Sequence, residues 1–457
     1  MGGVPMAVTR EAPRGQPRAA GVLERPYGKL APGPGKVASE VAAHQCVRIQ
    51  SALVDLVAEH GYAAVKVRDL VELAGVSTRA FYEHFEGKED CLLRTYERVT
   101  RHAMRHLIAS QTGERDWRER LRSVFGEFLR GLASKPNVAR LTLIEIYRAS
   151  PAALEQARRA ESTFSGMLSE SLARAPGGIV VPPLIVEAMV TGLACIARDR
   201  LLAGRVAELT DLIDELVEWA LRYPGKSAVA LAELDLQTVW RNTAFEPSIE
   251  APNGRKRERP FHGDRSIILA AVADRAVKKG YNSLTVTSVR AGTGVSRNTF
   301  YTHFRDLEDC FLAALEERAS DALAQAVRAQ TAGRTWAGGL YRAIAALCDQ
   351  VAEDPLLARA CLTDDFPPGS RGMRARQRLA SAVIEQLADS VPSELQVSAF
   401  AAEASVGAVW ALFRRYVARD WVQQRRDIAA TLSFLALAPA IGAPAAIAAI
   451  RREQTAT

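Results

Sequence analysis

Two segments of the sequence place hydrogen-bonding side chains where the first turn of a short helix would expose them. The first reads GVSTRAFYEHFEGKEDCL from Gly75 to Leu92, and the second reads GVSRNTFYTHFRDLEDCF from Gly294 to Phe311. Exposed Arg can donate two hydrogen bonds to guanine O6 and N7, and Asn can pair with adenine N6 and N7. Each such contact is worth about 1 to 3 kcal/mol of discrimination between bases. The segments therefore carry residue types suited to reading DNA.

The positions expected to read bases differ between the two segments. Ser77 suits the N-cap of the helix that follows, because a Ser hydroxyl can accept a hydrogen bond from an amide of the first turn. Ser296 is its counterpart in the second segment, and both serines are expected to contact DNA. After the cap, the first segment has Thr78, Arg79 and Ala80, and the second has Arg297, Asn298 and Thr299. We expect the two segments to prefer different bases. The alternative is that Arg79 and Arg297 are solvated surface charges.

The two segments belong to a duplication. Their matching residues recur at a constant offset of 219 positions, and the same offset pairs Trp117 with Trp336 and Pro136 with Pro355. A repeat of this length is a whole domain pair rather than a short solenoid element.

Helical periodicity surrounds both segments and predicts an all-α fold. Around the first segment, apolar residues at three-to-four spacing predict a helix ending near Gly61, then a helix over 67–74 and a tight glycine turn into the helix TRAFYEHF. Further helices are expected over 89–108, 117–133, 136–149, 151–173, 183–202 and 206–222. The second copy repeats the plan from 264, with closing helices over 393–419 and 422–438. Strict alternation is confined to a chance pair near Ile179, so strands are not expected.

Composition fits a folded cytoplasmic protein. The 457 residues are too many for one core and predict several domains, and the excess of seven basic over acidic residues is compatible with a polyanionic partner. Six cysteines without a CxxC pair are expected to be reduced core residues. The first forty residues lack an apolar run, so no signal peptide is expected. Ile428 to Ile450 is uncharged, but Pro439, Gly442 and Pro444 favour a buried helix followed by a short second one rather than a membrane span.

Together, the Gly-Tyr pair, the Gly-Val-Ser turn and Phe-Tyr-x-His-Phe resemble the TetR family of bacterial transcription regulators, over residues 44 to 95 and 263 to 314. The resemblance implies a three-helix DNA-binding domain and a larger helical domain that receives a small molecule, in each of two units. It also implies phosphate contacts, which fix register without reading sequence, by Tyr82, His84, Lys88, Tyr301 and His303.

The two copies depart from one another in three places that matter for this resemblance. Leu307 replaces Lys88, which removes one expected phosphate contact in the second copy. Gly292 is expected inside the second copy's second helix, at a cost of about 1 kcal/mol relative to Ala. Lys66 stands where the second copy has Thr285, which suits a helix cap better.

The predicted organisation has six parts. They are a flexible tail over 1–40, a helix-turn-helix domain over 41–95, a helical regulatory domain over 96–222, a linker over 223–262, a second helix-turn-helix domain over 263–314 and a second regulatory domain over 315–457. In the linker, the basic run from Arg255 to Arg259 either follows the DNA backbone or serves solubility.

Nothing in the sequence supports catalysis, a metal or a cofactor. No GxSxG, Walker, GxGxxG or HExxH pattern occurs. His102 and His106 lie one helical turn apart but have basic neighbours, so a solvated face is favoured over a metal site. The ligand pocket cannot be read from the sequence. Aromatic residues that could line it are more often core, and they are Trp117, Phe125, Phe128, Tyr147, Trp336 and Tyr341.

The sequence thus predicts a DNA-binding transcription regulator, a repressor, that acts as an intramolecular pseudo-dimer on double-stranded DNA and responds to a small-molecule effector. Residues 183–222 and 393–438 could supply the two halves of the four-helix interface that the family uses for dimerisation. Linking two modules raises the effective concentration of the second to about millimolar. Three alternatives stay open: a helical scaffold with a DNA-silent second copy, a homodimer with four reading heads that self-associates through these helices, and an enzyme built on the helical domains.

Overall fold

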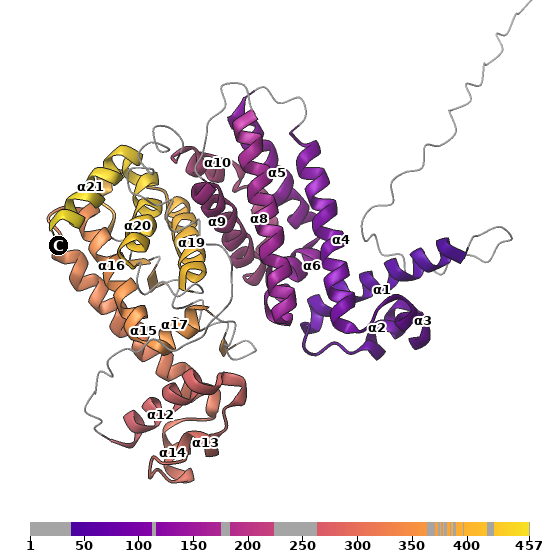
Figure 1. The fold of residues 1–457 in the computed structure, drawn as a ribbon, viewed down its shortest axis with the longest axis horizontal. Helices are drawn as coiled ribbons and strands as arrows, with labels where there is room; N and C mark the ends of the chain where they lie inside the picture. The colour runs from indigo at the N-terminus through magenta and orange to yellow at the C-terminus, as the bar shows by residue number, and fades with distance from the viewer. Residues whose placement is uncertain are drawn as a thin grey trace, which may run out of the picture. The chain divides into compact units, whose positions relative to one another are not determined.

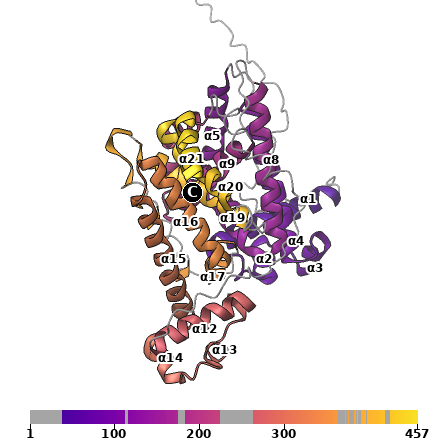
Figure 2. The same cartoon turned by 60° about the vertical axis from the view of Figure 1, so that its left-hand side comes forward.

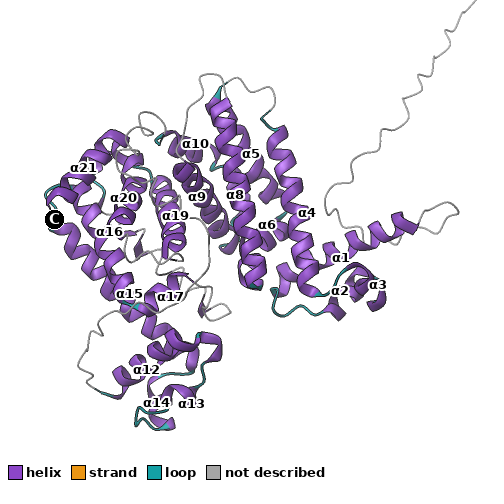
Figure 3. Ribbon diagram, in the orientation of Figure 1, coloured by secondary structure: helices purple, strands orange, loops and turns teal. Residues whose placement is uncertain are grey.

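Helices make up all regular structure in the described part of the chain (Figure 3). The structure, a computed structural model, describes residues 38–111, 116–174, 183–223, 263–362 and 371–456, the last range with gaps at 373–374, 376–377, 379–381, 384, 387–389, 396 and 418–424. The all-α prediction is confirmed. The strand-like pair near Ile179 lies outside these residues, as does the predicted linker from 224 to 262.

The described residues fall into two compact units, one up to His102 and one from Ala103. The first unit contains α1 (Ala38–His60), α2 (Val67–Ala74), α3 (Thr78–His84) and most of α4 (Lys88–Ala109). Its fully buried side chains come from all four helices and include Ile49, Leu53, Leu70, Phe81, Phe85 and Leu92. Burial of these groups explains why α2 and α3, which are short, form at all.

The second unit begins with the helices of the predicted regulatory domain over 96–222, called here the first regulatory half; the matching helices after residue 315 are the second regulatory half. The helices of the first regulatory half are α5 (Trp117–Ser134), α6 (Pro136–Arg140), α7 (Ile146–Ala149), α8 (Pro151–Arg174), α9 (Pro183–Leu202) and α10 (Ile213–Leu221). The expected single helix over 136–149 is interrupted by a π-helical turn, Leu141–Glu145. The prediction for 206–222 was too long, since Val206–Thr210 is a 3-10 turn that precedes α10.

The second copy follows in the same unit. Its helix-turn-helix part has α12 (Asp264–Lys279), α13 (Val286–Arg290), α14 (Arg297–His303) and the start of α15 (Leu307–Thr331). Its regulatory part adds α16 (Trp336–Glu353), α17 (Pro355–Leu362), α19 (Ala399–Val417), α20 (Arg425–Ile441) and α21 (Ala443–Ala456). Figure 2 shows α15 and α16 side by side.

Two predictions about the second copy were wrong in detail. Gly292 does not lie inside a helix, because α13 ends at Arg290 and Gly292 adopts a φ of 79° in the turn that follows. The helix expected from Ser393 begins only at Ala399, after a 3-10 turn over Ser393–Leu395.

The uncharged segment from Ile428 to Ile450 forms two helices, as expected. Gly442, with a φ of 79°, separates α20 from α21. Ile428, Phe434 and Ile450 are fully buried in the main core. None of the described helices is long and apolar enough to span a membrane.

The two regulatory halves share one core along α9 and α19, which lie against one another (Figure 1). Here an offset of 215 residues aligns Gly192 with Gly407 and Trp219 with Phe434. The helices come close at the two glycines: a Cβ on Gly407 would stand 3.0 Å from Cys195 Cβ, and one on Gly192 would stand 3.1 Å from the Ala404 carbonyl oxygen. Small residues therefore set the approach of the two halves.

Polar contacts run along the same interface. The Trp219 Nε1–H donates to Ser405 Oγ at 3.1 Å, and the Tyr223 hydroxyl donates to the Leu435 carbonyl at 2.8 Å. Trp219 and Tyr223 are fully buried and meet edge to face, with ring centroids 5.3 Å apart. Buried polar groups with matched partners fix one arrangement of the two halves.

Candidate nucleic-acid interface

The turn of the first helix-turn-helix depends on Gly75 and Arg48. Gly75 ends α2 in the left-handed region, with a φ of 61°, which favours glycine. The Arg48 guanidinium of α1 donates to the Ala74 carbonyl and, at 2.9 Å, to the Gly75 carbonyl. A Cβ on Gly75 would stand 2.7 Å from Arg48 Nη2. Glycine is therefore required both for backbone conformation and for the approach of Arg48.

The second copy braces the same turn differently. Ile267 occupies the position of Arg48. Instead, Arg290 Nε donates to the Val295 carbonyl at 3.1 Å and Arg275 donates to the Ala291 carbonyl. The predicted cap is confirmed at Thr285, whose hydroxyl accepts from the Ser288 amide at 3.0 Å.

The predicted N-cap at Ser77 is confirmed, and Ser296 caps the second recognition helix in the same way. Ser77 Oγ accepts from the Ala80 amide at 3.1 Å, and Ser296 Oγ accepts from the Thr299 amide at 3.0 Å. Each hydroxyl satisfies an amide that α3 or α14 would otherwise leave without a partner. The residues after each cap begin their helix at the same point in both copies.

In the first copy, Thr78 and Arg79 are exposed. The Arg79 side chain is 90% exposed, and its Nε lies 2.9 Å from Glu83 Oε1, one helical turn later. An exposed pair of this kind is worth little to stability, so Arg79 can exchange Glu83 for another acceptor at little cost.

In the second copy, Arg297 and Asn298 are exposed while Thr299 is half-buried. The Arg297 guanidinium lies 5.7 Å from the centroid of the Tyr301 ring. Thr299 Oγ1 lies 2.8 Å from Ser296 Oγ, within the cap. Arg297 and Asn298 are therefore more accessible than Thr299 to a nucleic acid.

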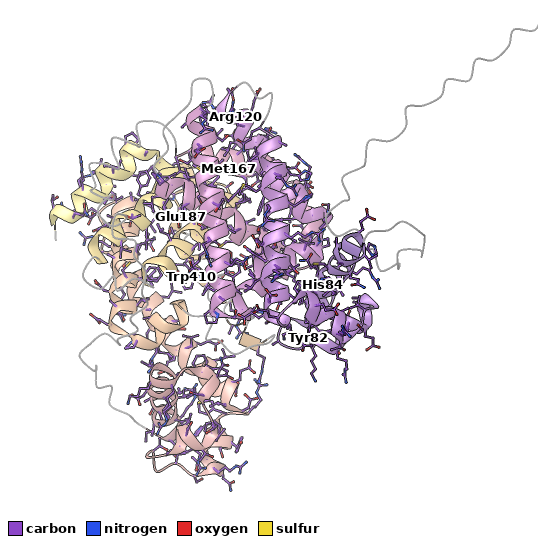
Figure 4. All side chains as sticks on the ribbon, turned by 45° about the vertical axis from the view of Figure 1, so that its right-hand side comes forward. Tyr82, His84, Arg120, Met167, Glu187 and Trp410 are labelled. Carbon is purple, nitrogen blue, oxygen red and sulfur yellow. The ribbon has the colours of Figure 1, made fainter. Side chains whose placement is uncertain are left out.

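The aromatic scaffold of the two copies is the same. Tyr82 and Tyr301 are 56% and 44% exposed, and each packs edge to face on the buried Phe beside it, at 5.3 Å from Phe81 and 5.4 Å from Phe300. His84 Nε2 lies 3.3 Å from Gln45 Oε1, whereas His303 is exposed. Figure 4 shows Tyr82 and His84 on α3.

Lys88 has an internal role that the sequence did not indicate. Its Nζ donates to the Tyr62 and Val65 carbonyls at 2.9 and 2.8 Å and lies 4.2 Å from the Tyr62 ring centroid. Burial lowers the pKa of the Lys88 ammonium. Lys88 thus ties α4 to the loop before α2. Leu307, its counterpart, packs against the apolar core of the second copy.

A contact of the second copy was also missed. Arg371 Nη2 lies 2.9 Å from Asp306 and 2.6 Å from Glu308, so it joins the start of α15 to the regulatory half. The first copy has Gly87 where the second has Asp306, and this difference was the available signal. Leu356 and Ala375 of the regulatory half are buried in the same apolar core as α12 and α14.

Comparison with known proteins agrees with this geometry. The family of bacterial regulatory proteins named tetR matches the chain twice, at residues 49–95 and 268–314. The chain thus carries two tetR-like helix-turn-helix domains in tandem. These tetR-like units have the fold of DNA-binding transcription regulators.

Solved structures with similarity to the chain are tetR-family regulators and related proteins. The fatty acid degradation regulator FadR from Bacillus halodurans is 20% identical, covering 39% of this chain and 94% of its own, with a TM-score of 0.37. FadR from Bacillus subtilis, solved in complex with stearoyl-CoA, is 18% identical over 38% of this chain and 96% of its own, with a TM-score of 0.35. A TetR family transcription regulator from Marinobacter aquaeolei is 22% identical over 39% of this chain and 95% of its own, with a TM-score of 0.33. No curated protein matches the chain.

Proposed function

We propose that this chain is a ligand-responsive repressor that binds DNA as an intramolecular pseudo-dimer on an operator with two unlike half-sites. The division into tail, two DNA-binding domains, two regulatory domains and linker belongs to this proposal. The observation that carries it is the α9–α19 interface, through which the two regulatory halves of a single chain share one core.

The unlike half-sites follow from the recognition helices. Thr78 and Arg79 stand after the cap of α3, and Arg297 and Asn298 stand after the cap of α14. Arg suits guanine and Asn suits adenine, so the second helix can read a base that the first does not. Six further residues would position the chain on phosphate oxygens or support the caps: Tyr82, His84, Lys88, Tyr301, His303 and Thr299.

Binding-site selection on the intact chain tests this proposal. We expect an imperfect palindrome, with Arg79→Ala relaxing one half-site and the Arg297→Ala/Asn298→Ala variant relaxing the other. Loss of one good base contact should cost about 1 to 3 kcal/mol at the affected position. A symmetric palindrome that both variants leave unchanged contradicts the assignment of base-reading residues.

Arg159→Ala is the matched control for Arg79→Ala. Arg159 is also an exposed helical residue that pairs with a glutamate one turn away, Glu155. It should leave the selected sequence and the affinity unchanged when both are measured at one stated salt concentration, since salt alone changes affinity for DNA.

The stoichiometry on DNA separates the pseudo-dimer from its alternatives. Mass measurement of the complex with the selected operator should give one chain per operator. Two chains per operator would favour a homodimer with four reading heads. In the binding-site selection, a second half-site that the Arg297→Ala/Asn298→Ala variant leaves unchanged would favour a DNA-silent second copy.

A further inference from the structure

An apolar cavity of about 170 Å³ lies inside the second regulatory half. Its wall comes from α15, α16, α19, α20 and four residues between positions 383 and 397, and aliphatic side chains such as Leu340, Leu347 and Val409 dominate it. Among the described lining residues none is charged, and Gln330, Gln386 and Ser405 contribute neutral polar groups. An apolar cavity of about 150 Å³ in another protein stays dry and binds benzene, so a cavity of this kind can hold a small apolar molecule.

On α5 the first regulatory half has larger side chains at several of the positions that match the cavity wall. The constant offset between Trp117/Trp336 and Pro136/Pro355 aligns α5 with α16 without a gap. Five cavity-lining positions of α16 have a bulkier counterpart on α5: Ala343 matches Val124, Ile344 matches Phe125, Leu347 matches Phe128, Cys348 matches Leu129, and Val351 matches Leu132. Each difference adds volume to the first half where the second half has a hollow.

The added side chains are packed. Phe125 and Leu129 are fully buried, and Phe128 stacks on Phe164 of α8 with ring centroids 5.7 Å apart. The α9 side of the first half is filled with polar groups as well. Arg198, which aligns with the cavity-lining Phe413, donates from Nε to the Leu143 carbonyl at 2.8 Å and lies 5.0 Å from the Tyr147 ring centroid.

Buried Glu187 gives a further difference of the same kind. It occupies the position on α9 that matches the cavity-lining Ala402 on α19. Figure 4 labels Glu187 on α9 and Trp410, another lining residue, on α19.

We propose that the two regulatory halves differ in ligand binding. The second half binds one uncharged, largely apolar small molecule per chain, and the first half is a filled partner that binds none. This inference rests on the proposed function and deepens it, since it names the half and the chemical class of the ligand. Moving a charged ligand from water into this wall would cost several kcal/mol with no counter-charge to offset it, whereas Gln330, Gln386 and Ser405 suit a hydroxyl, carbonyl or amide.

The cavity wall and the interface between the halves share α19. Val406 and Val409 line the cavity, whereas Gly407, between them in sequence, meets Cys195 of α9. Ser405 lines the cavity and accepts the hydrogen bond from Trp219 of α10. A ligand that moves α19 therefore acts directly on the contact between the two halves.

Fluorescence titration of the full chain with two matched probes tests the proposal. 1-Naphthylamine, whose two fused rings suit a cavity of this volume, is neutral at pH 7, and 1-naphthylamine-4-sulfonate has the same rings with one added charge. We expect the neutral probe to fill one site per chain and to bind at least about tenfold more tightly than the charged one. Equal affinity for the two probes, or two neutral-probe sites per chain, overturns the proposal.

Reciprocal swaps between the copies locate the site. Leu347→Phe/Cys348→Leu gives α16 the residues of α5 and should weaken binding of the neutral probe about tenfold or more, equivalent to about 1.4 kcal/mol, because the larger side chains occupy the space that the probe would fill. Phe128→Leu/Leu129→Cys, the reverse swap in α5, and Cys348→Ala, which enlarges the cavity, should leave this site occupied. Should the filling variant unfold by circular dichroism, Val409→Phe fills the cavity from α19 instead. Loss of the probe with the α5 swap alone would place the site in the first half and refute the inference.

These titrations contain no DNA, so they are independent of the proposed function. A chain that binds its operator but no neutral probe keeps the proposed function and loses this inference. A chain that binds the probe but selects no DNA sequence does the reverse.

Discussion

Arg200 of α9 and Glu403 of α19 form a bidentate ion pair between the two regulatory halves. The two guanidinium Nη atoms lie 2.7 and 2.8 Å from the two carboxylate oxygens, and the side chains are 12% and 21% exposed. Fork-to-fork geometry fixes the relative rotation of the helices as well as their distance. The pair joins residues 203 positions apart, so it connects the two copies of the duplication.

Removing one partner of this pair should destabilise the chain. Arg200→Met or Glu403→Gln leaves a largely buried charge without its partner, and we expect each to cost about 3 kcal/mol of unfolding free energy. The double variant should cost less than the sum. Urea unfolding measures the three values, and Arg174→Met, which breaks the exposed pair with Glu170, should change stability by under about 1 kcal/mol. Strict additivity of the two substitutions would show that the pair contributes no coupling.

The close approach of α9 and α19 at Gly192 and Gly407 should be sensitive to any larger side chain. Gly407→Ala places a Cβ 3.0 Å from Cys195 Cβ, so the Cys195 side of α9 must shift by a few tenths of an ångström, and we expect a loss of about 1 to 3 kcal/mol. Gly131→Ala is the control, because Gly131 also lies inside a helix but a Cβ there meets nothing within 4 Å. That substitution should stabilise α5 by about 1 kcal/mol, since Ala favours helix over Gly. Equal effects of the two substitutions on the thermal midpoint would argue against close packing at Gly407.

Stability should depend on pH through Asp199. Burial raises the pKa of the Asp199 carboxyl to about 6; the positive charge of Arg198 opposes this shift, and the negative charge of Glu403 adds to it. Because the folded pKa lies above the unfolded value of about 4, the stabilising contribution is complete below about pH 4 and is lost as pH rises through about 6.

Asp199→Asn removes this dependence. We expect the variant to be more stable than the parent chain above about pH 6, by 1 to 3 kcal/mol, and equal to it near pH 4. Urea unfolding at several pH values measures the difference. Asp274→Asn, in the exposed pair with Lys278, should follow the parent curve. A gain for Asp199→Asn that is constant with pH would contradict titration of this group.

The link between Arg371 and the start of α15 should limit the mobility of the second DNA-binding domain. Arg371→Ala removes the partner of Asp306 and Glu308, and we expect faster amide hydrogen exchange in α12 to α14 with little change in α1 to α3. Arg378→Ala, which breaks a single exposed pair with Glu316, serves as the control. If exchange in α12 to α14 is the same in both variants, the Arg371 contact does not hold the domain.

The sequence predicted the features that depend on local chemistry. Ser77, Ser296 and Thr285 cap helices because their hydroxyls act within three residues. The end of α2 at Gly75 was also predictable, since a glycine at the end of an apolar periodic segment suits a left-handed turn. The duplication itself was visible as a constant offset.

The features that depend on distant contacts were not predictable. Arg48 and Lys88 brace turns of the first DNA-binding domain through backbone carbonyls 23 to 27 positions away, and carbonyls carry no residue-type signal. The prediction placed Gly292 inside a helix because the sequence pattern does not show where a helix ends. A glycine within the helix and one just beyond it look the same until the backbone conformation is known. The cavity required the three-dimensional arrangement, since aliphatic residues at helical spacing are the same whether they fill a core or border a hollow.

The crossing of Gly192 and Gly407 also bears on how this protein can change by mutation. In a homodimer each residue at a two-fold crossing faces its own copy, so every substitution there occurs twice and must be compatible with itself. Here the two positions are encoded separately. Val190 and Ser405, which align across the copies, already differ, and a substitution on one side can be compensated on the other. The fused chain can therefore explore asymmetric interfaces one residue at a time, by steps that a symmetric pair of identical chains cannot take.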